Sequence, residues 1–219
     1  SPRTVRRYAL QSTQALVDRG IDVLVVACNT ASSFALDLLT KAYSEIPIFG
    51  VIAPGAESAV EASVTGCIAI IGTESTVRGG AYQKEIFRIN PSARVVARSC
   101  PLLVSLAENG WISGSVPNAV VNAYLVPWVF AEQQPDVLLL GCTHFPILAN
   151  TIKKIVGPKV RVIDSATTTA TSVMTAIGSG KGLGKLTLMA TDDVDRFARV
   201  GKSFLEQGID RLDVVQIDL

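Results

Sequence analysis

The chain has 219 residues, of which 48% are hydrophobic, enough to bury one sizeable core or two small ones. Its 20 Lys and Arg residues nearly balance its 19 Asp and Glu residues, and these charges are scattered. This balance argues against a surface that binds nucleic acid or an anionic membrane. Because the apolar runs are far shorter than a membrane span and the basic start is unlike a secretory signal, we expect a cytoplasmic protein.

The chain opens with an amphipathic helical pattern over residues 1–19 that no strand precedes. A helix that leads into a parallel strand normally crosses over from an earlier strand of the same sheet. We therefore expect that the sequence begins inside the fold and that a strand belongs before residue 1.

Short apolar runs alternate with helical patterns along the rest of the chain, which is typical of an α/β protein with parallel sheets. Apolar residues at helical spacing predict a helix from Ala31 to Ala42, and Pro54 and Pro146 each open another. The glycine-rich segment 178–184 lacks the ending of a phosphate-binding loop and is predicted to be a connector. The predicted strands are 21–27, 48–52, 68–71, 94–97, 137–140, 160–163 and 186–189.

The four cysteines, Cys28, Cys67, Cys100 and Cys142, are far apart in the sequence, so none forms a C-x-x-C zinc or redox pair. Free thiols are expected rather than disulfides, because a chain of this size can build a full core. Cys67 begins an apolar strand and Cys100 precedes a proline, so core packing explains both. The single histidine, His144, excludes a metal site with several histidine ligands.

The two remaining cysteines stand in matching segments, VVACNT at 25–30 and LLGCTH at 139–144. Each segment is an apolar strand, a small residue, the cysteine and then polar residues, which predicts two similar domains with a cysteine at a strand-to-helix turn. Free N–H groups at such a turn favour the thiolate and also bind a carboxylate. If the turns face each other, one thiolate can remove a proton from a carbon while the other thiol returns one to the opposite face. That exchange inverts a stereocentre.

Polar residues beside the two turns are the candidates for holding a substrate. Asn29, Thr30 and Thr143 flank the cysteines, although Asn29 and Thr30 are equally suited to cap the following helix. His144 would tune the thiol of Cys142 or donate a proton to the substrate, or it would simply pack or cap. The sequence alone leaves both interpretations open.

Three other sets of polar residues can be assigned a role only from where they stand in the sequence. Thr73 and Thr76 follow another apolar strand, where they would hold a ligand or cap a helix. Asp164 follows the predicted strand 160–163 and is expected to be a cap. Tyr82 and Glu85 lie one helical turn apart and are expected on the surface or at an interface.

The segments ACNTAS at 27–32 and GCTHFP at 141–146 resemble the two cysteine motifs of the glutamate racemases. Further segments resemble the same family in the same order, and the resemblance covers nearly the whole chain. The aspartate racemases are similar in fold, but Thr-His-Phe-Pro after the second cysteine resembles the glutamate branch. The further segments are GVIAPG at 50–55, GTEST at 72–76, CPL at 100–102 and IDSA at 163–166.

The resemblance implies two pseudo-symmetric α/β domains with the active site between them. Residues 1–52 and 165–219 would form the first domain, and residues 53–164 the second, inserted domain. Cys28 would deprotonate D-glutamate and Cys142 L-glutamate, with no pyridoxal phosphate, metal or other cofactor, and the D-glutamate would supply peptidoglycan synthesis. The residues that would hold glutamate or tune the thiols are Asn29, Thr30, Thr73, Thr76, Thr143 and His144.

Family members also share an opening strand ending in Asp-Ser-Gly and a later Pro-Tyr-Gly loop, and neither motif occurs in residues 1–219. One alternative is therefore an inactive, truncated fragment that only binds small acids. Another is a racemase of the same superfamily that acts on aspartate or another amino acid. A third is a thiol hydrolase with Cys142 as nucleophile and His144 as base, which leaves Cys28 without a role. The expected partner is glutamate, with neither nucleic acid nor membrane, and a homodimer is left open.

Overall fold

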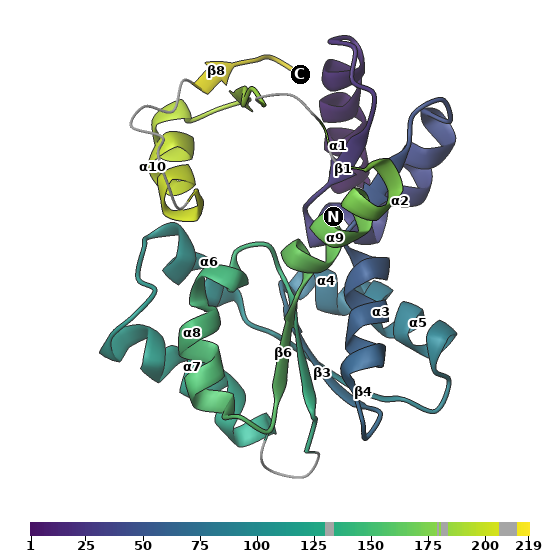
Figure 1. The fold of residues 1–219 in the computed structure, drawn as a ribbon. Coiled ribbons are helices and arrows are strands. Elements are labelled where there is room, and N and C mark those ends of the chain that lie inside the picture. Colours follow the sequence, from purple (N-terminus) through teal and green to yellow (C-terminus); the bar gives the residue numbers. More distant parts are fainter. Residues whose placement is uncertain (130–133, 179, 181–183, 206–213) are drawn as a thin grey trace.

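The computed structural model of the chain describes residues 1–129, 134–178, 180, 184–205 and 214–219. Every strand pair in these ranges is parallel, and helices alternate with the strands along the chain. The predicted α/β class with parallel sheets is therefore confirmed (Figure 1). The strands are β1 (Leu24–Val26), β2 (Ile48–Gly50), β3 (Cys67–Gly72), β4 (Arg94–Ser99), β5 (Val137–Gly141), β6 (Arg161–Asp164), β7 (Leu188–Ala190) and β8 (Val214–Gln216).

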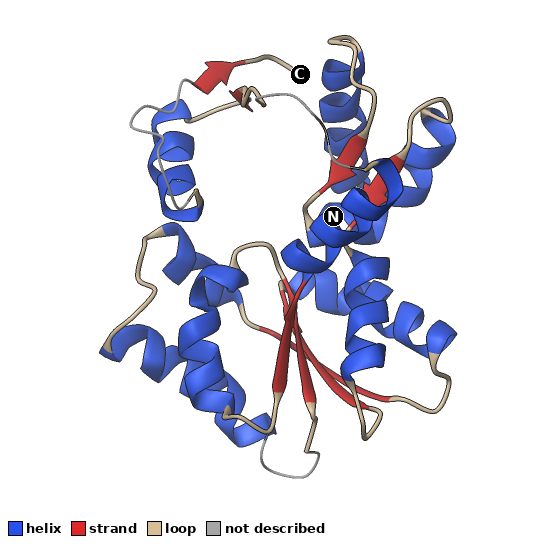
Figure 2. Cartoon of the chain, in the orientation of Figure 1, coloured by secondary structure: helices blue, strands red, loops and turns tan. Residues whose placement is uncertain are grey.

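The largest sheet has four strands in the order β4-β3-β5-β6, and helices cover both of its faces (Figure 2). Every residue of β3 and β5 is buried, as expected for parallel strands covered on both sides. Alternate residues of these strands enter two different cores, one with α3 and α5 and one with α6, α7 and α8. These helices are α3 (Ile52–Ala62), α5 (Ala81–Ile89), α6 (Pro101–Glu108), α7 (Ser115–Val129) and α8 (Ala149–Val156).

The other strands form two smaller sheets, β1-β2 and β7-β8. The β1-β2 pair packs with α1 (Pro2–Val17) and α2 (Asn29–Ala42) around a small third core that includes Leu24, Ala35 and Leu39. Figure 1 shows α10 (Val194–Phe204) beyond the end of α6, on the same side of the molecule as β7 and β8. The remaining helices are α4 (Glu74–Gly79), the 3-10 helix η1 (Phe145–Leu148) and α9 (Ser165–Ile177).

The predicted strands are all present, with ends that shift by a few residues. The predicted 21–27 is only Leu24–Val26, and the predicted 186–189 is Leu188–Ala190. The opening helix is confirmed, with Ser1 as its N-cap. Of the predicted connector 178–184, residues 179 and 181–183 lie outside the described residues.

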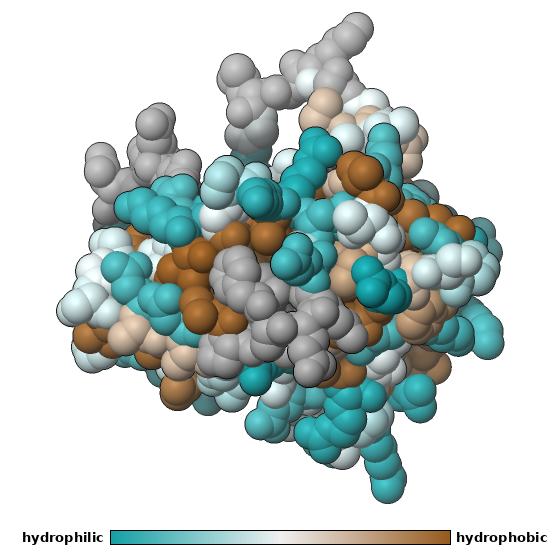
Figure 3. Space-filling model, turned by 90° about the horizontal axis from the view of Figure 1, so that it is seen from below, coloured by the Kyte–Doolittle hydropathy of each residue, from teal (hydrophilic) through white to brown (hydrophobic). Residues whose placement is uncertain are grey.

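Figure 3 views the molecule from the end at which the four strands of the largest sheet begin. Hydrophobic side chains gather there over the side where α7 and α8 lie, with hydrophilic side chains around them. Within the described ranges, none of the helices has both the length and the apolar character needed to cross a membrane. The turn of Cys142 lies at the opposite end of this sheet, where β5 finishes, whereas the turn of Cys28 follows β1 of a two-stranded sheet.

Candidate active site

Cys28 and Cys142 both follow the carboxyl end of a parallel strand. Cys28 follows β1 and is the N-cap of α2, without a side-chain capping bond, whereas Cys142 lies between β5 and η1. The two turns lie close together, because Asn29, which follows Cys28, and Gly141, which precedes Cys142, both contact the side chain of Tyr82 on α5. The exposure of the two cysteines differs, since Cys28 is exposed and Cys142 is only 5% exposed.

The pKa of Cys142 is raised to about 11, chiefly by burial and to a smaller extent by the charges of Cys28 and Glu108. Hydrogen bonds from the backbone N–H groups of His144 and Phe145 act against this rise by lowering the pKa of Cys142. The sequence predicted that such N–H groups would favour the thiolate. For Cys142 that prediction is wrong, because loss of solvent on burial outweighs the N–H groups. The thiol is therefore the resting form of Cys142.

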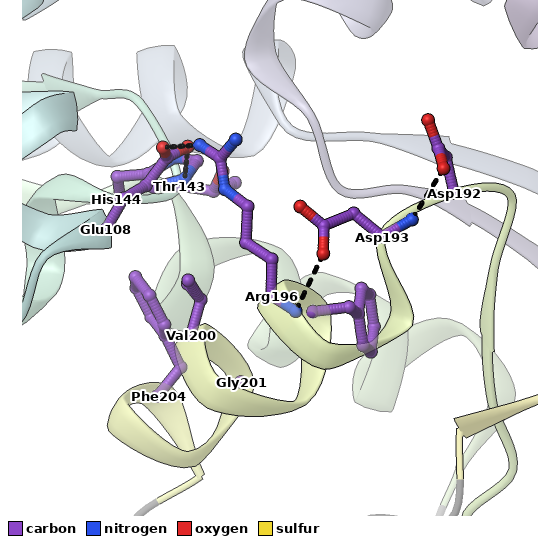
Figure 4. A pocket seen from close by; sticks show the side chains of 10 residues that line it. Glu108, Thr143, His144, Asp192, Asp193, Arg196, Val200, Gly201 and Phe204 are labelled. Carbon is purple, nitrogen blue, oxygen red and sulfur yellow. Dashed lines mark hydrogen bonds and ion pairs between the residues drawn. The ribbon is translucent and has the colours of Figure 1, made fainter.

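The imidazole of His144 lies between Cys142 and the carboxylate of Glu108, and Figure 4 shows its contact with Glu108. Its Nδ1 lies 3.7 Å from Sγ of Cys142, and its Nε2 lies 3.3 Å from Oε1 of Glu108. Arg196 of α10 contacts the other oxygen of Glu108 at 2.5 Å, and the ring of Phe204 packs edge-on against His144 at 5.7 Å. Because a carboxylate accepts from Nε2–H, Nδ1 is left as the acceptor that faces the thiol.

Glu108 is the functional residue that the sequence did not single out. It is the one charged residue of α6, whose sequence is PLLVSLAE, and it belongs to no motif. That isolated charge at the end of an apolar helix was the only signal in the sequence. Glu108 lines a cavity of about 530 Å³ between the end of α6 and α10. The cavity is also lined by Thr143, His144, Asp192, Asp193, Arg196, Phe197, Val200, Gly201 and Phe204.

Three of the predicted site residues, Thr30, Thr73 and Thr76, meet in one cluster. The hydroxyl of Thr30 lies 3.0 Å from that of Thr73 and 3.1 Å from that of Thr76, and the last two lie 3.0 Å apart. Thr73 is also the N-cap of α4, where its hydroxyl accepts from the N–H of Thr76 at 3.2 Å. The two roles considered for Thr73, capping and facing the site, are therefore compatible.

Asn29 is buried beside Cys28 and is held by two hydroxyls. Its Nδ2 donates to the hydroxyl of Tyr82 at 2.7 Å and to Oγ of Ser165 at 3.2 Å. The capping alternative for Asn29 is wrong, because the N-cap of α2 is Cys28. The prediction that Tyr82 lies on the surface or at an interface is also wrong, since Tyr82 is completely buried where α5 packs on α3. Its partner in that prediction, Glu85, forms an ion pair with Arg88 at 2.7 Å.

The other cysteines and Asp164 have structural roles, as predicted. Cys67 and Cys100 are fully buried, and burial raises the pKa of both thiols, to about 12 for Cys100. Asp164 caps α9 by accepting from the N–H of Thr167 at 2.7 Å. Within the described residues, no group of three or more His, Cys, Asp and Glu residues could hold a metal ion.

With this geometry in place, comparison with known proteins identifies the family. Residues 2–173 match the family model described as Asp/Glu/Hydantoin racemase. The chain belongs to this racemase family. Among curated relatives, it is 43% identical to a glutamate racemase of Geobacter metallireducens, over 100% of this chain and 82% of the relative. It is 40% identical to one of Aquifex aeolicus, over 96% of this chain and 80% of the relative.

Solved structures of the family agree with the fold. A glutamate racemase isoform of Bacillus anthracis matches with a TM-score of 0.91 and 31% identity, over 100% of this chain and 82% of that one. A glutamate racemase of Francisella tularensis, solved in complex with D-glutamate, matches with a TM-score of 0.88 and 27% identity, over 100% and 81% of the two chains. The arrangement of α/β elements described above is thus that of the family.

Proposed function

We propose that this chain interconverts L- and D-glutamate by moving the α-proton between Cys28 and Cys142. The observation that carries the proposal is that two cysteines from the ends of different strands lie near one another, because Asn29 beside Cys28 and Gly141 beside Cys142 both contact the side chain of Tyr82. A single nucleophilic cysteine would not require that arrangement. The choice of glutamate rests on the relatives, which are glutamate racemases at up to 43% identity.

The proposed reaction is a proton exchange on the two faces of one carbon. For D-glutamate, the thiolate of Cys28 takes the α-proton, and the electron pair of the broken C–H bond stays on the α-carbon. The thiol of Cys142 then donates its proton to the opposite face, which leaves Cys142 as the thiolate. L-glutamate reacts in the reverse order. No cofactor takes part in this proposal, so N–H and hydroxyl groups of the chain must stabilise the negative charge.

Two sets of side chains support this role. His144 is placed to receive or return the proton of Cys142, because its Nδ1 lies 3.7 Å from that sulfur. The proposed substrate-holding residues surround Cys28 and the cavity beside His144. These residues are Asn29, Thr30, Thr73, Thr76 and Thr143.

The proposal includes two domains that contribute one thiol each. Residues 53–164 would form one domain. In support, the four-stranded sheet and its helices lie within that range, except for Ile52, the first residue of α3. Residues 1–52 and 165–219 would form the other, which contains the two smaller sheets. We also propose a cytoplasmic location, where the four free cysteines stay reduced, and a role in supplying D-glutamate for peptidoglycan.

We further propose a second copy of the chain as a partner, bound at the uncharged surface of α6 and α7. Among the described residues, no charged side chain lines the two hollows there, of about 370 and 340 Å³, and two of the residues that line them, Leu102 and Trp111, are 54% and 57% exposed. In a two-fold dimer, the same surface of both copies forms the interface, so like charges on that surface would repel each other. An uncharged surface avoids this repulsion. Sedimentation velocity would show a dimer that Trp111→Glu dissociates and that Phe87→Glu, a control at an exposed residue of α5, does not. A monomeric wild-type protein would contradict this proposal.

Deuterium exchange at the α-carbon tests the reaction itself. The protein is incubated with D- or L-glutamate in deuterium oxide, and loss of the α-proton signal and of optical rotation are followed by NMR and polarimetry. We expect the wild-type protein to cause both the loss of the α-proton signal and the loss of optical rotation. We expect Cys28→Ala and Cys142→Ala to lose racemisation. Cys67→Ala, a change at a core cysteine, is the matched control and keeps the activity.

The same experiment separates the alternatives. Faster exchange with aspartate than with glutamate would change the substrate assignment within the family. Hydrolysis of a thioester that depends on Cys142 but not on Cys28 would favour the thiol hydrolase, which the contact between Cys142 and His144 also permits. Absence of exchange with any amino acid would refute racemisation by this chain.

A further inference from the structure

Tyr82 lies between the two cysteine turns, although it belongs to α5 and is distant from both in the sequence. Its side chain is completely buried. The hydroxyl end contacts Asn29, which directly follows Cys28, and the ring contacts Gly141, which directly precedes Cys142. One side chain thus touches a neighbour of each thiol.

The ring of Tyr82 is held between two glycines. A Cβ atom added to Gly141 would lie 3.0 Å from Cε2 of the ring, and one added to Gly55 would lie 3.2 Å from Cε1. Both distances are shorter than ordinary van der Waals contact, so the ring occupies space that any larger residue at either position would need. The ring therefore sets where the strand end before Cys142 can lie.

The hydroxyl of Tyr82 fixes the amide of Asn29. Nδ2 of Asn29 donates to this hydroxyl at 2.7 Å and to Ser165 at 3.2 Å, and the hydroxyl of Tyr82 donates to the carbonyl of Val51 at 3.3 Å. Oδ1 of Asn29 is buried and has no hydrogen-bond partner among the described residues. Whichever way the amide is turned, one end meets the two hydroxyls and the other end has no partner. A buried polar atom of this kind is suited to a polar group of a ligand.

We propose that Tyr82 is a positioning residue that couples the two thiol-bearing turns, through its hydroxyl to Asn29 beside Cys28 and through its ring to Gly141 beside Cys142. This inference rests on the proposed function, because it assigns Tyr82 a role in the same reaction. Tyr82 acts through its neighbours and touches neither thiol in the described contacts.

The first test removes only the hydroxyl, with Tyr82→Phe. We expect kcat/KM for glutamate to fall about tenfold, equally in both directions because the enantiomers are equally stable, with a higher KM and a smaller change in kcat. Tyr124→Phe is the matched control, because it also removes one tyrosine hydroxyl that forms a hydrogen bond. That hydroxyl accepts from the N–H of Leu102 on α6 at 3.4 Å rather than contacting Asn29. Wild-type kinetics in Tyr82→Phe would overturn the role of the hydroxyl.

A double-mutant cycle shows whether the hydroxyl acts through Asn29. If it does, Tyr82→Phe in an Asn29→Ala background causes little further loss of kcat/KM. In the same background, Tyr124→Phe has no effect. Additive losses from Tyr82→Phe and Asn29→Ala would mean that the tyrosine affects activity by another route, and would overturn the proposed coupling.

The second test needs no substrate and addresses the ring. Tyr82→Leu removes the support of Gly141, so we expect iodoacetamide to modify Cys142 about tenfold faster, as followed by mass spectrometry. Tyr124→Leu is the control and leaves the rate unchanged. An unchanged rate in Tyr82→Leu would overturn the role of the ring, and if that variant does not fold, Tyr82→Met, which also removes the ring, is measured in its place. Inactivity of the wild-type protein would refute the proposed function alone, since the alkylation rates remain measurable.

Discussion

The turns that carry Cys28 and Cys142 share a sequence pattern but lie at different depths in the structure. The turn of Cys28 follows the three-residue strand β1, which pairs with β2 alone among the described strands and includes Val25 at 40% exposed. The turn of Cys142 follows β5, a five-residue strand that is buried throughout between β3 and β6. Two thiols with similar local sequences therefore have different environments. A motif places a thiol at a strand end, but the number of strands and helices around it sets its exposure and its pKa.

The largest expected difference between the two turns is in alkylation. At pH 8, iodoacetamide should modify Cys28 at least about a hundred times faster than Cys142, because Cys28 is exposed, whereas Cys142 is buried and its pKa of about 11 leaves only about one thiolate in a thousand. Peptide mapping by mass spectrometry over time gives both rates. Equal rates would show that the two turns are alike in solution.

Glu108 should matter for the turn of Cys142 and not for that of Cys28. Without Glu108, nothing in the described contacts fixes the tautomer of His144, so Glu108→Ala should lower kcat/KM for glutamate about ten- to hundredfold. Glu85→Ala is the control, because it breaks an ion pair with Arg88 on α5. If Glu108→Ala also slows a variant that lacks His144, Glu108 does not act through the imidazole.

The buried thiols should make stability depend on alkaline pH. Burial raises the pKa of Cys142 to about 11 and that of Cys100 to about 12, so the folded state holds these protons at a pH where the unfolded chain releases them. Their contribution to stability is complete below about pH 9 and is lost as the pH rises toward these values. Urea unfolding between pH 7 and pH 11 should give a steeper decline for wild type than for Cys100→Ala. The same slope for both proteins would contradict the raised pKa of Cys100.

The smallest effect concerns how the helices beside the turns begin. Cys28 caps α2 without a side-chain bond, whereas the hydroxyl of Thr73 caps α4 at 3.2 Å. Thr73→Ala should therefore cost about 1 kcal/mol of unfolding free energy, measured by urea denaturation. Thr40→Ala, at an exposed site within α2, should cost nothing measurable. A loss of stability in the control as large as that in Thr73→Ala would remove the capping explanation.

Much of the fold follows from local sequence. Runs of Val, Ile and Leu predicted the strands of the largest sheet to within two residues, because strands covered on both faces must be apolar throughout. The strand β8 was not predicted, because Val214–Gln216 is too short to show a pattern. The two cysteine turns were predicted from an apolar run followed by Cys and polar residues, a pattern that is continuous in the sequence.

The roles of Tyr82 and Glu108 were not predictable in this way. Tyr82 was expected on the surface or at an interface from its spacing on α5, but α5 packs with that face against α3 and the strand ends. Glu108 was not singled out, because its partners His144 and Arg196 come from distant parts of the chain. The sequence alone determined that two thiols stand at strand ends in an α/β protein, since strand burial and turn chemistry act between near neighbours. Only the tertiary structure decided which thiol is buried and which side chains hold the turns, because packing joins residues that no local pattern connects.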